Sequence, residues 1–120
     1  MKILVIEDGK FFQNFYSLKL KAKGFEVEIA ADGDEGLLKA KSNQPNLILL
    51  DIIMPKKDGF EFLKEFNVDP LNQKIPVIVF STLGQEADIQ KAKSLGARDY
   101  VNKSFFDFEN LYSKIVSYLK

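Results

Sequence analysis

The chain has 120 residues, 46% of them hydrophobic, which is enough for one cooperative domain with an apolar core and too little for two. It contains no cysteine and no histidine, so disulfide scaffolds, thiolate metal sites and Ser-His triads are excluded. Seventeen basic and seventeen acidic residues cancel, which argues against direct binding of nucleic acid or of an anionic membrane. Since no apolar stretch approaches the ~20 residues that span a bilayer, we expect a cytoplasmic protein.

Short apolar runs alternate with longer stretches of helical periodicity. The five runs are residues 3–6, 27–30, 47–50, 77–80 and 100–101. They are almost continuously apolar, which is typical of parallel strands that helices cover on both faces. The expected helices cover residues 10–23, 33–44, 59–69, 86–95 and 108–119.

Residues that start or stop helices support these limits. Asp32 is a plausible N-cap of the second helix, and Gly24 and Gly96 are suited to the C′ positions of the first and fourth helices. The last helix carries one apolar stripe, made of Phe108, Leu111, Tyr112, Ile115 and Leu119. With right-handed crossovers, this order of elements predicts an α/β fold with a doubly wound open parallel sheet.

Polar residues stand where the predicted strands end. Glu7 and Asp8 follow the first strand, Asp51 the third, Ser81 the fourth, and Lys103 comes shortly after the fifth. The carboxyl ends of parallel strands share one edge, so these side chains should meet there. Three carboxylates at one edge repel one another unless a cation joins them, and Mg²⁺ prefers such oxygen ligands. Lys103 and Ser81 could then bind the oxygens of a phosphoryl group that Asp51 accepts as nucleophile.

Four segments together resemble the receiver domain of two-component response regulators. They are residues 3–8, 49–55 with the pair Asp58-Gly59, 79–82 and 96–103, and the likeness covers essentially the whole chain in the right order. The resemblance implies one receiver domain over residues 1–120. It also implies a flavodoxin-like fold with five helices and five strands in the order 2-1-3-4-5.

The same resemblance implies roles for single residues. Asp51 corresponds to the phosphoacceptor, and Glu7 and Asp8 to the acids that hold Mg²⁺ with it. The backbone carbonyl of Ile53 corresponds to a further metal ligand. Two groups that grip the phosphoryl group correspond to Ser81 and Lys103, and Tyr100 corresponds to an aromatic residue that turns inward on activation, although a packed strand aromatic is an equal alternative.

The sequence departs from the family pattern after the lysine. Receivers usually place a proline there in a cis peptide, whereas this chain has Ser104. A cis bond before a non-proline residue costs about 2.5–4 kcal/mol, so the loop either keeps that strain or adopts a trans peptide with a rearranged path. Ile53 and Leu83 occupy the positions that flank the phosphoryl group in the family. Because both are apolar and cannot orient water, we expect slow dephosphorylation.

An aromatic group opens the first helix. Phe11, Phe12 and Phe15 cannot all face the core at ~100° per residue, so at least one is expected to be exposed beside the acidic residues. Receivers dock their phosphodonor there, although core packing with one incidental exposed ring is the alternative. Phe105 corresponds to a buried aromatic of the family.

The predicted function is that of a signalling protein rather than an enzyme. It takes a phosphoryl group from a histidine kinase or a phosphotransfer protein and signals to a downstream protein through the fourth helix, fifth strand and fifth helix. The chain would act as a stand-alone receiver or as a piece of a longer regulator. Two alternatives are a receiver-fold interaction module that works without phosphorylation, and a phosphohydrolase with an aspartyl-phosphate intermediate. The second lacks the expected aspartate two residues after Asp51, where Ile53 stands.

Overall fold

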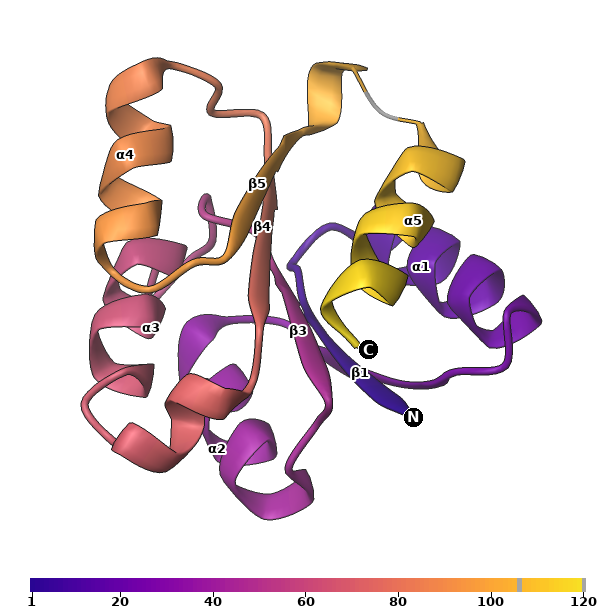
Figure 1. Cartoon of the computed structure of the whole chain (residues 1–120), viewed down its shortest axis with the longest axis horizontal. Coiled ribbons are helices and arrows are strands. Elements are labelled where there is room, and N and C mark those ends of the chain that lie inside the picture. Colours follow the sequence, from indigo (N-terminus) through magenta and orange to yellow (C-terminus); the bar gives the residue numbers. More distant parts are fainter. Residues whose placement is uncertain (106, 120) are drawn as a thin grey trace.

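The computed structural model describes residues 1–105 and 107–119, and it has five strands and five α-helices in regular alternation (Figure 1). The strands are β1 (Lys2–Ile6), β2 (Glu26–Ala30), β3 (Leu47–Leu50), β4 (Val77–Ser81) and β5 (Asp99–Asn102). The α-helices are α1 (Lys10–Ala22), α2 (Gly33–Asn43), α3 (Gly59–Phe66), α4 (Glu86–Ser94) and α5 (Phe108–Tyr118). The side chain of Phe105, which was expected to be buried, lies outside the described part of the structure.

All strand pairs are parallel, and the sheet order is β2-β1-β3-β4-β5, as predicted. Strand β3 lies at the centre, and all four of its residues are buried. This explains why its sequence is apolar without alternation. Because the strands run the same way, residues 7, 51 and 81 reach the same edge of the sheet.

Two layers of helices cover the sheet. Helices α2, α3 and α4 lie on one face, and α1 and α5 lie on the other (Figure 1). The core beneath α1 and α5 includes Tyr16, Leu20, Leu111 and Ile115, packed against β1, β3 and β4. The core beneath the other three helices is built mainly around Phe62, Leu63 and Phe66 of α3. Each amphipathic helix therefore buries one stripe against the sheet.

The helix limits follow the signals in the sequence with small differences. Asp32 caps α2 by accepting a hydrogen bond from the Glu35 N–H at 2.9 Å, and Gly24 has the left-handed φ of 93° expected after α1. Asp58 caps α3 in the same way, through the Glu61 N–H at 2.9 Å. Two 3₁₀ turns were not predicted, Pro70–Lys74 and Lys103–Phe105. Within the described residues, no helix has both the length and the apolar character needed to cross a membrane.

Candidate functional site

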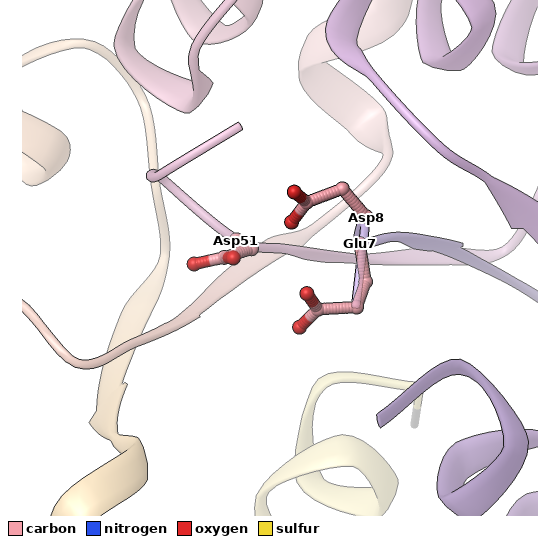
Figure 2. A group of neighbouring side chains, drawn as sticks. All are labelled: Glu7, Asp8 and Asp51. Atoms are coloured by element: carbon pink, nitrogen blue, oxygen red, sulfur yellow. The ribbon is translucent and has the colours of Figure 1, made fainter. Parts of the chain in front are cut away.

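Three carboxylates meet at the carboxyl edge of the sheet. Glu7 and Asp8 follow β1, and Asp51 follows the neighbouring strand β3, whose backbone is fixed by a 2.9 Å hydrogen bond from the Asp51 N–H to the Ile6 carbonyl. One ligand oxygen from each lies within 4.8 Å of the others, and Figure 2 shows the three carboxylates gathered at the strand ends. Glu7 and Asp51 are only 3% and 7% exposed, whereas Asp8 is open to solvent. The group has the oxygen-only character that suits a hard divalent cation.

Glu7 is held by contacts to its backbone and to both of its carboxylate oxygens. The side-chain amide of Gln13 donates to the Glu7 carbonyl at 2.6 Å, and the Gly9 N–H donates to Oε2 at 3.0 Å. Burial raises the pKa of Glu7, the hydrogen bond from Lys103 opposes this, and the charge of Asp51 adds to the rise. A buried carboxylate next to a second one is costly, so an added cation would relieve repulsion here.

Lys103 reaches this pocket from the 3₁₀ turn that directly follows β5. Its Nζ lies 2.5 Å from Glu7 Oε1 and 3.4 Å from Asp51 Oδ2, and its side chain is only 7% exposed. No peptide bond in the described part of the chain is cis, so the Lys103–Ser104 bond is trans. The Ser104 N–H donates to Asn102 Oδ1 at 2.8 Å. Of the two alternatives for this loop, the structure therefore has the trans peptide, with a 3₁₀ turn that still brings the ammonium to Asp51.

Ser81 is the last residue of β4, and Tyr100 is the second residue of the neighbouring strand β5. Ser81 is fully buried, and its Oγ accepts a hydrogen bond from the Leu83 N–H at 3.2 Å. The Tyr100 hydroxyl donates to the Leu83 carbonyl at 2.5 Å, so the half-buried ring is directed toward the β4–α4 loop. Burial raises the pKa of Tyr100, against the opposing effect of a hydrogen bond with Ser81. The two hydroxyls thus share one short network.

The two apolar positions expected to flank the phosphoryl group differ in their surroundings. Ile53 is 53% exposed, and its N–H lies 3.4 Å from Asp51 Oδ1. Leu83 is half-buried and packs against the core beneath α2, α3 and α4. Its side chain is therefore less available at the mouth of the pocket than that of Ile53.

The sequence profile of the response regulator receiver domain matches residues 3–116 of this chain. The chain belongs to the response-regulator receiver family. The receiver is 34% identical over 119 residues to the DNA-binding dual master transcriptional regulator RpaA of Synechocystis sp., covering 99% of the chain and 49% of the relative. It is 36% identical over 104 residues to the alkaline phosphatase synthesis transcriptional regulatory protein PhoP of Bacillus subtilis, covering 87% of the chain and 42% of that protein.

The chain thus spans about half the length of these curated relatives. Among solved structures, the chemotaxis protein CheY4 of Vibrio cholerae superimposes with a TM-score of 0.91 at 31% identity, covering 98% of each chain. A likeness that extends over the whole length of that protein supports both the predicted family and the predicted fold.

The aromatic residues of α1 take three different positions in this receiver. Phe11 is 72% exposed, and its ring stacks on Phe15 with the centroids 6.2 Å apart. Phe15 is half-buried against Phe108 of α5. The ring of Phe12 is also half-buried and lies near Lys103. The exposed ring expected from the helical period is therefore Phe11.

Two residues near the site, Gln13 and Phe80, were not identified from the sequence, and Phe12 was expected at a docking surface but not beside Lys103. Gln13 is the buried polar member of a stripe that continues with Tyr16 and Leu20, and its amide fixes the Glu7 backbone. A glutamine within an apolar stripe is the signal that could have found it. Phe12 and Phe80 lie close to the Lys103 ammonium, and no spacing in the sequence connects residues so far apart.

Proposed function

We propose that this receiver accepts a phosphoryl group on Asp51, in the presence of Mg²⁺, from a phosphohistidine of a histidine kinase or of a phosphotransfer protein. One observation carries the proposal: a nearly buried aspartate lies within 3.4 Å of a buried lysine ammonium and next to two further carboxylates. An aspartate that only solvates the protein surface is not expected to lie next to a buried lysine and two further carboxylates. We also propose that residues 1–120 act as one receiver domain and that the protein works in the cytoplasm.

The chemistry follows from the groups that surround Asp51. A carboxylate oxygen attacks phosphorus, an O–P bond forms, and the P–N bond to the donor imidazole breaks, with its electron pair going to the nitrogen. Lys103 offers three N–H donors, and Ser81 offers a hydroxyl, to the phosphoryl oxygens. Mg²⁺, when held by Asp8, Asp51, the Ile53 carbonyl and, through water, Glu7, would neutralise the negative charge that gathers during transfer.

The output is a change in the surface of α4, β5 and α5. Ser81, Leu83 and Tyr100 are already joined by hydrogen bonds between the site and this surface. A phosphoryl group that draws the Ser81 hydroxyl toward itself would alter the β4–α4 loop and, with it, the position of the Tyr100 ring. A downstream protein partner would recognise the altered face.

The phosphodonor would dock at the start of α1. This helix begins at Lys10, two residues after Asp8, so the exposed ring of Phe11 and its stacking partner Phe15 would flank the acidic residues on the surface that the donor meets. Phe12 would contribute the edge of the same surface. Exposed aromatic rings with low side-chain entropy are effective contact residues at protein interfaces.

Labelling with acetyl phosphate and Mg²⁺ tests the proposal, with intact-mass spectrometry as the readout. The parent protein and Asp34→Asn, which changes an exposed acid of α2, should gain one phosphoryl group, and Asp51→Asn should gain none because an amide cannot form the acyl phosphate. Equal labelling of Asp51→Asn would refute the assignment. An unlabelled parent would favour the interaction module, and repeated turnover of phosphate would favour the phosphohydrolase.

A further inference from the structure

Two aromatic rings stand beside the ammonium group of Lys103. Its Nζ lies 4.3 Å from the ring centroid of Phe12 and 5.6 Å from that of Phe80. Both distances fall within the ~6 Å over which the face of a ring attracts a cation, and the attraction grows when water is excluded. The Lys103 side chain is 7% exposed, so this contact is largely desolvated.

The backbone of the loop that carries Lys103 does not by itself determine where the ammonium group lies. The residue after it is Ser104, and the loop is anchored through the Asn102 side chain to the Ser104 N–H. A lysine has a flexible four-carbon stem, so its charge is placed by what surrounds the charge. Here the nearest carboxylate is Glu7 at 2.5 Å, and Asp51 is farther away at 3.4 Å. Carboxylates alone would therefore hold the ammonium toward Glu7 rather than toward the acceptor.

A ring face, unlike a carboxylate, does not occupy the hydrogen-bond donors of the ammonium group. It attracts the ammonium without accepting its hydrogen bonds in a fixed direction, so the ring itself occupies none of the three N–H donors that could bind phosphoryl oxygens. A shift of the charge from Glu7 toward Asp51 would break the hydrogen bond to Glu7, but it would not require a hydrogen bond to the ring to break.

The Phe12 ring is itself held in place by its neighbours. Its centroid lies 5.8 Å from that of Phe80 in an edge arrangement and 6.1 Å from that of Tyr16. Tyr16 and Phe80 in turn contact each other at 5.3 Å. Three rings from α1 and β4 thus fix one another beneath the site. A group supported in this way can place a charge precisely, because its own rotamer is locked by packing.

We propose that Phe12 is a positioning residue for phosphoryl transfer, which keeps the Lys103 ammonium next to Asp51 in a loop that lacks the proline usual after this lysine. The inference rests on the proposed function, since it assigns Lys103 its role at the phosphoryl group. Phe80 supports the Phe12 ring and contributes the more distant of the two ring contacts.

The test compares Phe12→Leu and Phe12→Met, which lose the ring, with Phe12→Tyr, which keeps it. Phe25→Leu is the matched control, because Phe25 is a half-buried ring that packs on the same core and contacts Tyr112. Acetyl phosphate is the donor because it needs no docked partner. We expect both ringless variants to be labelled about five- to ten-fold more slowly at saturating Mg²⁺, and Phe12→Tyr to recover most of the rate.

A spectroscopic readout separates positioning from a general loss of stability. The ε-methylene protons of Lys103 should show an upfield ring-current shift in the parent protein, in Phe12→Tyr and in Phe25→Leu, and should lose it in the two ringless variants. A labelled parent whose ringless variants react as fast as Phe25→Leu would overturn the inference alone. A parent that is not labelled would overturn the proposed function, and the role of Phe12 with it.

Discussion

On one side of the pocket Glu7 and Asp8 follow β1 directly, and two groups only a few residues away hold Glu7, namely the Gly9 N–H and the Gln13 amide. On the other side Lys103 is placed by groups far from it in the sequence, the Glu7 carboxylate and the Phe12 ring. The first half of the site is therefore a local structure at the end of a strand. The second half exists only when α1, β1 and β5 are packed together, so the two halves should respond differently to mutation.

The largest expected effect comes from removing the lysine charge. Lys103→Met leaves the buried Glu7 without its partner, and we expect the free energy of unfolding of the metal-free protein to fall by about 3 kcal/mol. The control is Lys114→Met, because Lys114 pairs with Asp99 on a partly exposed surface, where a pair contributes about 1 kcal/mol or less. Urea unfolding measures both. Equal losses in the free energy of unfolding would mean that the buried contacts of Lys103 stabilise the protein no more than an ordinary surface ion pair does.

A mutation on the side of the pocket that holds Glu7 and Asp8 should change the affinity for Mg²⁺. Asp8→Asn removes one charged ligand from the group of three, and we expect the affinity for Mg²⁺ to fall by roughly ten-fold or more. Asp34→Asn, which changes an exposed acid of α2, should bind Mg²⁺ as the parent does. Calorimetric titration with Mg²⁺ measures the affinities of the parent and of both variants. An Asp8→Asn variant with unchanged affinity would place the metal elsewhere.

A smaller effect is expected where Tyr100 meets the β4–α4 loop. Tyr100→Phe deletes the hydrogen bond to the Leu83 carbonyl and should lower the free energy of unfolding by about 1 kcal/mol. Tyr112→Phe, in which the ring still packs against Phe25 and Phe108, serves as the control. Denaturant melts of the two variants give the comparison, and identical midpoints would remove Tyr100 from the network at the site.

The smallest effect concerns the lifetime of the phosphorylated state. Ile53→Asn and Leu83→Glu each add a group that can orient water near the acyl phosphate, and we expect phosphate to be lost about three-fold faster or more. The increase in the rate of phosphate loss should be larger for Ile53→Asn than for Leu83→Glu, because Ile53 is exposed and Leu83 packs into the core. Decay after removal of the donor is measured with Mg²⁺ held fixed.

Val68→Asn is the matched control for the decay experiment, because Val68 is a 79% exposed apolar residue outside the site. If both site variants decay at the rate of this control, neither side chain lies on the path of the attacking water. The lysine loop would then be the next segment to vary.

The sequence alone determined most of the fold. Four-residue apolar runs such as residues 47–50, in alternation with stretches of helical periodicity, predict a parallel sheet under two layers of helices, and Asp32 and Gly24 set helix limits through local backbone geometry. The order of the strands came from the resemblance to receivers. The convergence of Glu7, Asp8, Asp51 and Ser81 follows from that sheet, because each residue stands directly at the end of a strand.

Only the tertiary structure determined the features that depend on contacts between side chains of different helices, strands and loops. Whether the bond after Lys103 is cis or trans could not be determined from Ser104, since the outcome depends on how the whole loop packs. Lys103 approaches Glu7 more closely than Asp51, and nothing in the order of the residues indicates which of the two carboxylates is nearer. The Phe12 ring lies beside that ammonium because α1 packs with this ring against Phe80 of β4. Sequence patterns record local geometry and the periodicity of burial, whereas contacts between residues some ninety positions apart arise only when the helices pack against the sheet.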